Sequence, residues 1–325
     1  MKVLAGDIGG TKTLLQVVEV GKKSRRICHE ARFESADWPA FSPLVGEFLC
    51  DTYPPLPETA CFAVAGPVEG KRAKLTNLPW EDLDATHLAD YFGMREVLLI
   101  NDFLAVGHGI QGLAEAEIAT LQAGQEQPHA PRAIIGAGTG LGQGILVWKN
   151  GRYGPLDTEG GHVDFAPLDA EQEGLLRFLK TRYAHVSYER LLSGSGLVEI
   201  YRFLCNSAAT KRESTIIDSQ PDLAAAISAA ALDASDPIAV HALHLFARIY
   251  GQQAGNLALT CLARGGVYVA GGIAPRILPF LQDGEFIRAF RAKGRMERLL
   301  VDMPVRVVLN PRVGLLGAAI VASRI

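Results

Sequence analysis

A carboxylate, two adjacent glycines, a hydroxyl and an amine interrupt an apolar β-forming run in "LAGDIGGTKTLLQVV". Asp7 precedes Gly9 and Gly10, and Thr11 and Lys12 follow them. A phosphate chain needs several backbone N–H groups pointing at it, and glycine lets the backbone approach closely enough to supply them. A carboxylate beside such a loop can hold Mg²⁺, usually through water. The stretch therefore predicts a magnesium–phosphate loop, with a plain hairpin turn as the alternative.

A second glycine-rich turn joins two strand-like runs in "RAIIGAGTGLGQGILVW", residues 132–148. Gly138, Thr139 and Gly140 stand at this turn and could bind phosphate in the same way. The glycine spacing also fits a dinucleotide fingerprint. That fingerprint must open a helix, however, and "QGILVW" is typical of a strand, so a Rossmann fold is rejected.

A third glycine pair, Gly271 and Gly272, follows a strand-like run in "GGVYVAGGIAP". Pro275 is well placed to begin a helix after it. Such a pair could pass under an adenine ring, although alone it more often serves tight packing of a strand against a helix. The three glycine turns in this order point to a nucleotide much more specifically than any one of them does.

Two polar residues, Asn101 and Asp102, follow the apolar run "EVLLI". Open α/β sheets bind ligands at the carboxyl ends of their strands, so both residues could face a substrate. Asn and Asp are also favoured helix N-caps, and spacing alone favours the cap slightly.

Further polar residues occur in "EGGH" and "HVSYERL", which contain Glu159, His162 and Glu189. Glu-x-x-His on a helix could bind a metal, but the two glycines argue against a helix here. The structural alternative for the first pair is a polar turn. The alternative for Glu189 is a solvated glutamate in the first turn of a helix capped by Ser187.

Strand-like and helix-like segments alternate along the chain, which indicates an α/β fold. The first two glycine turns each join two strand-like runs and suggest two related halves, each bringing a glycine loop to a shared cleft. The length suggests two domains, a smaller one of residues 1–111 plus 313–325 and a larger one of residues 112–312. The predicted strands are 1–6, 13–20, 25–33, 59–65, 96–100, 132–148 (on both sides of its turn), 265–275 and 305–310, and the predicted helices are 38–50, 84–91, 169–182, 187–192, 196–205, 221–231, 237–262 and 313–323.

Charge and composition narrow the classes of function. The net charge of −3 over 325 residues gives no reason to expect nucleic acid or an anionic membrane as a partner. No apolar stretch approaches the roughly 20 residues that span a bilayer, and we expect no signal peptide. The five cysteines are scattered without a CxxC pair, which indicates reduced thiols in the cytoplasm and no zinc site.

The order Asp-x-Gly-Gly-Thr, Gly-Thr-Gly-x-Gly and Ala-Gly-Gly resembles the actin-like ATPase superfamily of sugar kinases, hsp70-type chaperones and actin. Within it the chain closely resembles the bacterial glucokinase family that has no zinc motif. The motifs that carry the resemblance extend from Gly6 to Pro275 and cover most of the chain: "GDIGGTKT", "AVAGPV", "LTNLPW", "INDFLAVGHGI", "GAGTGLGQG", "EGGHVDFAP", "HVSYERLLSGSGLVEIYRF" and "VAGGIAP".

The resemblance implies two actin-like ATPase (ribonuclease H-like) domains flanking a cleft, and ATP-dependent phosphorylation of D-glucose at the 6-hydroxyl. It makes Asp102 the catalytic base and Asn101 the ligand of a neighbouring hydroxyl. It makes Glu159, His162 and Glu189 direct sugar ligands. Asp7 would hold Mg²⁺ through water, and the expected ATP-binding residues are Asp7, Gly9, Gly10, Thr11, Lys12, Gly138, Thr139, Gly140, Gly271 and Gly272.

Two alternatives stay open: a kinase for another hexose, such as mannose or fructose, and a non-catalytic sugar sensor, which would not need Asp102. A related kinase family follows its Glu-x-x-His with zinc-binding cysteines. "EGGHVDFAPLDAEQE" has no cysteine, so we expect no structural zinc. The start of the chain at the first strand counts against the DNA-binding repressors of this fold. The expected partners are glucose and ATP, with ADP or polyphosphate still open as donor, and the resemblance implies a homodimer.

Overall fold

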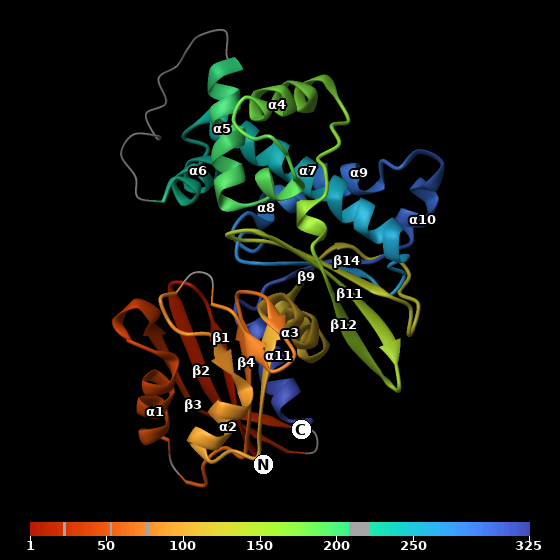
Figure 1. The fold of residues 1–325 in the computed structure, drawn as a ribbon. Coiled ribbons are helices and arrows are strands. Elements are labelled where there is room, and N and C mark those ends of the chain that lie inside the picture. Colours follow the sequence, from red (N-terminus) through yellow and green to blue (C-terminus); the bar gives the residue numbers. More distant parts are fainter. Residues whose placement is uncertain (22–23, 53, 76–77, 208–221) are drawn as a thin grey trace. The chain divides into compact units, whose positions relative to one another are not determined.

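The computed structural model describes residues 1–21, 24–52, 54–75, 78–207 and 222–325 (Figure 1). Thr76 and Asn77 of the "LTNLPW" motif lie outside these residues. Pro221, where a helix was expected to begin, lies outside them as well.

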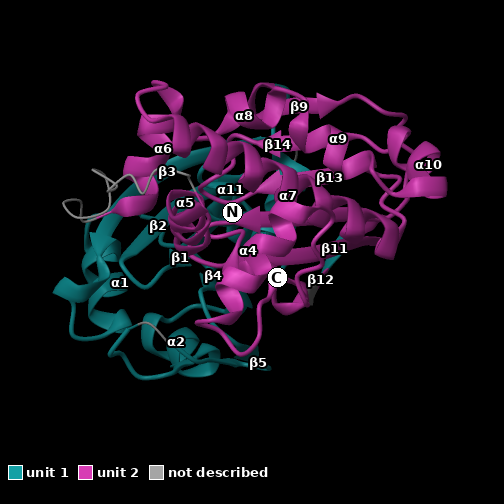
Figure 2. Cartoon of the chain, turned by 90° about the horizontal axis from the view of Figure 1, so that it is seen from above, with its two compact units in different colours: residues 1–115, 153–155, 310–325 teal, residues 116–152, 156–309 magenta. Residues whose placement is uncertain are grey.

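The chain divides into two compact units (Figure 2). Unit 1 comprises Met1–Glu115, Tyr153–Pro155 and Asn310–Ile325, and unit 2 comprises Ala116–Arg152 and Leu156–Leu309. The predicted pair of domains, divided near residue 111, stays a prediction, because compactness alone does not show that either part folds independently.

Unit 1 contains a five-stranded mixed sheet with the order β3-β2-β1-β4-β8. Its strands β1, β4 and β8 are parallel, whereas β2 pairs antiparallel with both β1 and β3. The parallel strands therefore end at one edge of the sheet, where this class of fold binds ligands. The strands are β1 (Lys2–Ile8), β2 (Lys12–Val20), β3 (Arg25–Glu34), β4 (Thr59–Val64) and β8 (Glu96–Asn101).

Capping residues set both ends of α2 (Ala85–Phe92). Asp84 begins α2 because its carboxylate accepts the N–H groups of Thr86 and His87, and Gly93 ends it in a left-handed conformation with φ of 64°. The remaining elements around the sheet are α1 (Phe41–Cys50), α2 (Ala85–Phe92), α3 (Asp102–Gly109), α11 (Val313–Ala322), the 3-10 turns η1 (Ser35–Asp37), η2 (Ile110–Gly112) and η3 (Glu115–Glu117), and a small sheet of β5 (Val68–Glu69), β6 (Arg72–Ala73) and β7 (Leu83–Asp84).

Alternation along β1 decides which neighbours its side chains meet. Leu4 and Ile8 belong to the core formed with α1 and α2, whereas Val3 and Ala5 belong to the core formed with α11. Asp7 has the same parity as Val3 and Ala5, so its side chain emerges on the face that α11 covers. The period of two thus places a carboxylate beside this helix at the ligand-binding edge.

Unit 2 contains a six-stranded sheet with the order β12-β11-β10-β13-β14-β9. In unit 2, β10 pairs antiparallel with β11 and parallel with β13, and β13 pairs parallel with β14. The strands β1, β2, β4 and β8 of unit 1 follow the same pattern. The two glycine turns, β1–β2 and β10–β11, therefore hold equivalent places, as the sequence led us to expect. The strands are β9 (Ile118–Gln122), β10 (Arg132–Ala137), β11 (Leu141–Lys149), β12 (Arg152–Thr158), β13 (Val267–Ala270) and β14 (Val305–Val308).

The largest hydrophobic core of the described chain lies in unit 2, around α7. Asp236 caps this helix and Pro237 occupies its first turn, which is where proline is tolerated. The helical elements of unit 2 are α4 (Ala170–Lys180), α5 (Gly194–Ser207), α6 (Leu223–Leu232), α7 (Pro237–Cys261), α8 (Leu278–Gln282), α9 (Glu285–Arg291), α10 (Glu297–Val301), η4 (Gly160–His162), η5 (Tyr188–Arg190) and η6 (Gly294–Met296).

Three local predictions were wrong. Asp7 lies inside β1 rather than on the loop, because it pairs with Leu14 on one side and with Ala63 on the other. The helix predicted over residues 187–192 is only the 3-10 turn η5, and the Ser187 side chain makes no capping bond. No helix begins at Pro275, since the turns after β13 continue to the start of α8. In addition, the strands β5, β6, β7, β9 and β12 and the helices α8, α9 and α10 were not predicted.

Within the residues that the structure describes, no single helix is both long and apolar enough to cross a membrane. Only α6 and α7 taken together reach that length and composition, and a bend of 102° separates them.

Candidate active site

Two carboxylates lie at the ligand-binding edge of the sheet in unit 1. Asp7 is near the end of β1, and Asp102 is the first residue of α3, directly after β8. Burial is the main cause that raises the pKa of Asp7 to about 6; the charge of Asp102 raises it further, and Lys12 opposes the shift. Burial also raises the pKa of Asp102, against the hydrogen bond from the Phe103 N–H. Both carboxylates are thus more basic than in water.

Asn101 is the N-cap of α3, which was the alternative to a substrate contact in the sequence analysis. Its Oδ1 accepts the backbone N–H groups of Phe103 at 2.9 Å and Leu104 at 3.3 Å. Its Nδ2 donates to the carbonyl of Gly66 at 3.4 Å. A carboxamide nitrogen carries two hydrogens, so the capping role and a contact with a substrate hydroxyl are compatible.

Glycines let α11 pack directly against α3 and Asp7. A β-carbon on Gly109 of α3 would lie 1.9 Å from the carbonyl oxygen of Val313. A β-carbon on Gly314 would lie 3.6 Å from Oδ2 of Asp7, which is ordinary contact distance. The close contact between these two helices therefore helps to position Asp102, the first residue of α3.

The turn between β1 and β2 is a tight hairpin, closed by a hydrogen bond from the Gly9 N–H to the Lys12 carbonyl at 3.0 Å. Ser35 braces it from η1: its N–H donates to the Thr11 carbonyl at 2.9 Å and its hydroxyl donates to the Gly9 carbonyl at 3.3 Å. The hydroxyl of the buried Thr13 lies 3.0 Å from that of Ser35. Ser35 and Thr13 were not among the predicted residues, whereas Thr11 and Lys12 are exposed as a phosphate contact requires.

The turn between β10 and β11, residues 138–140, is the equivalent hairpin in unit 2, here called the phosphate hairpin. The Gly138 N–H donates to the Gly140 carbonyl at 2.8 Å, and the Gly194 N–H donates to the Gly138 carbonyl at 2.9 Å. The N–H groups of Thr139 and Gly140 donate to no partner among the described residues. They are therefore the donors that a phosphate could use.

Gly271 supports the start of this hairpin from below. Its φ is +83°, and a β-carbon on it would lie 2.4 Å from the Ala137 carbonyl oxygen, so only glycine fits. The fully buried Tyr250 hydroxyl accepts the Ala137 N–H at 3.0 Å. Gly272 differs, because a β-carbon on it would meet nothing within 4 Å. Gly271 is thus a packing residue, and Gly272 borders open space.

Glu159, His162 and Glu189 gather in unit 2. His162 Nδ1 lies 3.8 Å from Oε1 of Glu189, and its Nε2 lies 3.8 Å from Oε2 of Glu159. These distances are too long for direct hydrogen bonds. The His162 ring nitrogens and the carboxylate oxygens facing them can therefore hydrogen-bond to a ligand instead of to one another. The side chains are 91%, 58% and 29% exposed for Glu159, His162 and Glu189, respectively. We call this trio the acid–histidine cluster.

Backbone and amide contacts tie this cluster to the phosphate hairpin. The Leu141 N–H donates to Oε2 of Glu189 at 3.0 Å. A β-carbon on Gly161 would lie 2.1 Å from the Leu141 carbonyl oxygen, so η4 presses directly on the same residue. Gln143, almost fully buried, donates to the Gly160 carbonyl at 3.0 Å. Gln143 was not predicted, because a lone glutamine in a strand carries no local signal.

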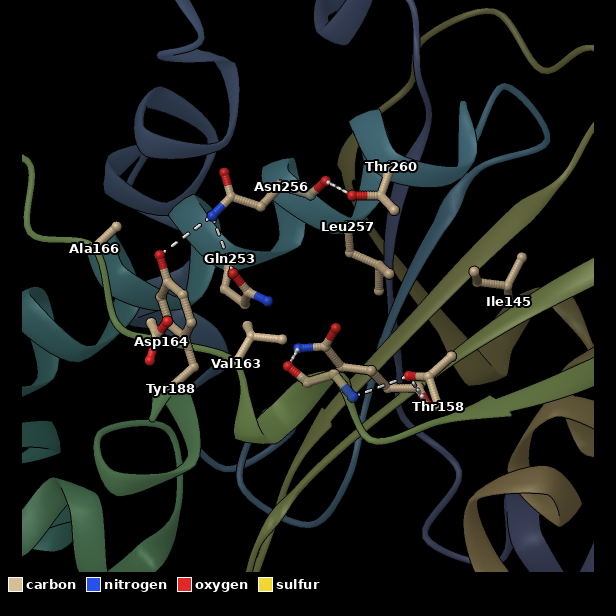
Figure 3. A pocket seen from close by; sticks show the side chains of 12 residues that line it. Ile145, Thr158, Val163, Asp164, Ala166, Tyr188, Gln253, Asn256, Leu257 and Thr260 are labelled. Carbon is tan, nitrogen blue, oxygen red and sulfur yellow. Dashed lines mark hydrogen bonds between the residues drawn. The ribbon is translucent and has the colours of Figure 1, made fainter. Parts of the chain in front are cut away.

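A cavity of about 300 Å³ lies behind the "EGGH" segment in unit 2 (Figure 3). Tyr188, Gln253 and Asn256 line it, and the Tyr188 hydroxyl accepts from Asn256 Nδ2 at 3.2 Å. None of the predicted site residues lines it, although Thr158 and Gly160, the chain neighbours of Glu159, do, so the cavity is distinct from the acid–histidine cluster. Its full lining is Gln143, Ile145, Thr158, Gly160, Val163, Asp164, Ala166, Tyr188, Gln253, Asn256, Leu257 and Thr260.

In the part of the chain that the structure describes, no three His, Cys, Asp or Glu side chains gather as a metal site. All five cysteines are free thiols. Asp7 and Asp102 are the two carboxylates at the edge of the unit 1 sheet near which a cation would be stabilised.

Comparisons with known proteins identify the family of the chain. A family model described as Glucokinase matches residues 4–325. A glucokinase of Nostoc punctiforme is 44% identical over 339 residues, which cover 99% of this chain and 99% of the relative. The solved glucokinase of an Antarctic psychrotroph has a TM-score of 0.88 at 29% identity, over 100% of this chain and 99% of that one. A ROK family glucokinase from Streptomyces griseus, in complex with glucose and AMPPNP, has a similar fold, with a TM-score of 0.67 at 24% identity and 100% of both chains covered.

Proposed function

The chain belongs to the glucokinase family, and we propose that it transfers the γ-phosphoryl group of ATP to the 6-hydroxyl of D-glucose. The products are glucose 6-phosphate and ADP, as in the first step of glycolysis. The observation that carries the proposal is Asp102, a largely buried carboxylate of raised pKa at the carboxyl end of a parallel strand.

Asp102 acts as the general base. Phosphoryl transfer depends mainly on positioning and charge neutralisation, with one carboxylate accepting the proton of the attacking hydroxyl. The Phe103 N–H holds Oδ1 of Asp102 at 2.8 Å and so orients the carboxylate. The raised pKa makes this carboxylate a better proton acceptor than an aspartate in water.

Glucose is bound by Asn101 and Asp102 together with the acid–histidine cluster. Glu159 and Glu189 accept hydrogen bonds from hydroxyls, and His162 can donate or accept. Asn101 and Asp102 belong to unit 1, and the acid–histidine cluster belongs to unit 2. The proposed reaction requires both sets to act on one glucose molecule.

ATP is bound through glycine turns. In the first turn, formed by Gly9, Gly10, Thr11 and Lys12, the loop backbone, the Thr11 hydroxyl and the Lys12 ammonium face the phosphates. In the phosphate hairpin, the unpartnered N–H groups of Thr139 and Gly140 serve the same purpose, and Gly138 lets the backbone approach closely. Gly272 leaves room for the adenine, and Gly271 keeps that surface close to β10.

Mg²⁺ accompanies ATP in this proposal, with Asp7 as its ligand through water. A cation would relieve the unfavourable burial of Asp7 and its repulsion by Asp102, both of which raise the pKa of Asp7. Kinase sites hold Mg²⁺ with one or two carboxylates plus substrate phosphates, so two carboxylates suffice. When bound, the ion neutralises charge that develops on the transferred phosphoryl group.

The remaining partners are also proposals. A reduced, cytoplasmic enzyme agrees with five free cysteines. We propose a homodimer, with no structural zinc, no nucleic acid and no membrane partner. Size-exclusion chromatography with light scattering, and metal analysis of the purified protein, test the first two of these statements.

A coupled assay of ADP release, run with ATP and a panel of sugars, tests the function, and formation of the sugar phosphate is measured with ADP or polyphosphate as donor. We expect turnover with glucose and ATP that depends on Mg²⁺. Binding of glucose without turnover under any donor would replace the kinase with a sugar sensor. Turnover of mannose or fructose in preference to glucose would replace it with another hexose kinase.

A further inference from the structure

We infer that Glu189 couples the two substrates: by accepting the Leu141 N–H it ties the acid–histidine cluster to the phosphate hairpin, so that bound glucose raises the affinity for ATP. The inference rests on the proposed function and goes beyond it, because it assigns Glu189 a positioning role toward the nucleotide in addition to its contact with the sugar.

The two oxygens of Glu189 face different partners. Oε2 accepts from Leu141, at the end of the phosphate hairpin, at 3.0 Å. Oε1 faces His162 Nδ1 at 3.8 Å, within the acid–histidine cluster. One carboxylate therefore has one oxygen on the nucleotide side and the other on the sugar side.

The backbone of the Glu189 segment reinforces this link. The Ser193 hydroxyl donates to the Glu189 carbonyl at 2.8 Å, and the next residue, Gly194, donates its N–H to the Gly138 carbonyl at 2.9 Å. The hairpin is thus held at its beginning through Gly138 and at its end through Leu141 by one short segment of chain.

Gly140 shows how closely the hairpin fits around this carboxylate. A β-carbon on Gly140 would lie 2.5 Å from Oε2 of Glu189, so the two cannot both keep their places if Gly140 gains a side chain. A β-carbon on the neighbouring Gly138 would meet nothing within 4 Å. The position of the hairpin and the position of the Glu189 carboxylate therefore depend on each other.

Glucose can act through this contact because Glu189 is partly exposed. Its side chain is 29% accessible, so water competes for the carboxylate in the absence of sugar. A sugar hydroxyl on Oε1 favours the conformer whose Oε2 holds Leu141, which is the conformer that keeps the hairpin ordered for phosphates. A ligand that favours one conformer raises the affinity of any other ligand that needs it, and the coupling is reciprocal.

Glu159 provides a matched control within the same cluster. Its side chain is 91% exposed, and it has no hydrogen bond to the phosphate hairpin among the described residues. Loss of the Glu159 side chain should weaken glucose binding. It should not change the factor by which bound glucose raises the affinity for the nucleotide.

The first experiment measures binding of Mg²⁺ and the non-hydrolysable analogue AMPPNP by calorimetry, with and without saturating glucose. For the wild type we expect glucose to tighten AMPPNP binding at least about fivefold, the lower end of common coupling between sites. In Glu189→Ala the ratio of AMPPNP affinity with glucose to that without glucose should fall to about 1. In Glu159→Ala this ratio should equal that of the wild type, once enough glucose is added to saturate the weakened sugar site. Glu189→Gln, whose Oε1 can still accept from Leu141, should restore part of the ratio.

The second experiment substitutes glycines of the phosphate hairpin and measures glucose binding in the absence of nucleotide. Gly140→Ala should weaken glucose binding at least about fivefold, whereas Gly138→Ala should leave it unchanged. Circular dichroism checks that both variants fold. This comparison decides the inference even if Glu189→Ala no longer binds glucose.

The outcomes separate the inference from the function. A wild type that phosphorylates glucose but binds AMPPNP equally with and without it overturns the coupling alone. So does Glu189→Ala with the full wild-type ratio, or equal glucose affinity in Gly140→Ala and Gly138→Ala. A wild type that neither binds nor phosphorylates glucose overturns the proposed function instead.

Discussion

Gly317 of α11 lies so close to α3 that a β-carbon on it would stand 1.8 Å from the carbonyl oxygen of Ala105. No side chain fits in that space without separation of the two helices. Since Asp102 is the first residue of α3, the proposed catalytic base is positioned by a contact one helical turn away from it, on a partner helix more than 200 residues later in the sequence.

Gly317→Ala should therefore affect both stability and catalysis. Forced separation of packed backbones costs about 1–3 kcal/mol, and we expect a lower melting temperature together with a kcat reduced at least about tenfold. Gly46→Ala in α1 is the control, because its β-carbon would meet nothing within 4 Å and alanine favours a helix interior by roughly 0.5–1 kcal/mol over glycine. A kcat unchanged in Gly317→Ala would show that α11 does not position Asp102.

Asp102→Asn tests the base itself. The amide keeps the size of the side chain and can still accept the Phe103 N–H, but it cannot take up a proton. We expect kcat to fall on the order of 10²–10⁴-fold, with near-normal glucose binding. Steady-state kinetics together with a glucose titration followed by intrinsic tryptophan fluorescence separates the two effects. Turnover within a few-fold of the wild type would remove Asp102 from the mechanism.

The raised pKa of Asp7 should make the stability of the protein depend on pH. Its pKa is about 6 in the folded protein, mainly through burial, whereas an unfolded aspartate titrates near about 3.9. Between these values the native state binds more protons than the unfolded state, so the free energy of unfolding falls as pH rises. Asp7→Asn should raise that free energy by about 1–3 kcal/mol at pH 7.5, and by very little below about pH 4.

Urea denaturation at the two pH values measures this difference. The same stabilisation at both would mean that the substitution acts through packing rather than through the charge. In activity assays Asp7→Asn should raise KM for MgATP at least about tenfold, with glucose affinity as the internal control. A variant with normal use of MgATP would remove Asp7 from the metal site.

Local patterns in the sequence predicted most of what is local in the structure. The strands β4 and β8, the helices α2 and α7 with their acidic caps, and the glycine turns all follow from residues that are neighbours in the chain. The trio of Glu159, His162 and Glu189 is brought together as the family resemblance implied. Their roles toward a sugar stay a prediction.

The supporting residues could not be predicted, because their contacts connect distant parts of the chain. Ser35 braces a turn 26 residues earlier, and Tyr250 accepts an N–H from Ala137, 113 residues away. Neither contact leaves a periodic trace in the sequence. The helix expected over residues 187–192 failed for the same reason: the Tyr188 N–H donates to the Val163 carbonyl, and the tyrosine ring is buried in the core.

The choice of sugar follows from polar groups that the proposal places on both sides of the ring. Inversion at C2, as in mannose, would leave a donor or acceptor of the acid–histidine cluster unpaired, at a cost of about 1–3 kcal/mol. N-acetylglucosamine adds bulk at the same carbon. We expect kcat/KM for glucose to exceed that for either sugar by at least about tenfold, since each 1.4 kcal/mol is a factor of ten.

Glu159→Gln should narrow this preference while it lowers the affinity for glucose. The carboxylate only accepts hydrogen bonds, whereas the amide also donates and so can meet a hydroxyl in either orientation. The Glu159 side chain is 91% exposed and makes no hydrogen bond among the described residues, so the variant should fold normally and differ only in what it offers to the sugar. The coupled assay, run with glucose and with mannose on wild type and variant in parallel, measures the ratio of kcat/KM for glucose to that for mannose in each protein. Equal efficiency of the wild type with glucose and mannose would replace the strict glucose specificity with that of a broad hexokinase, and an unchanged ratio in the variant would mean that Glu159 does not read the C2 hydroxyl.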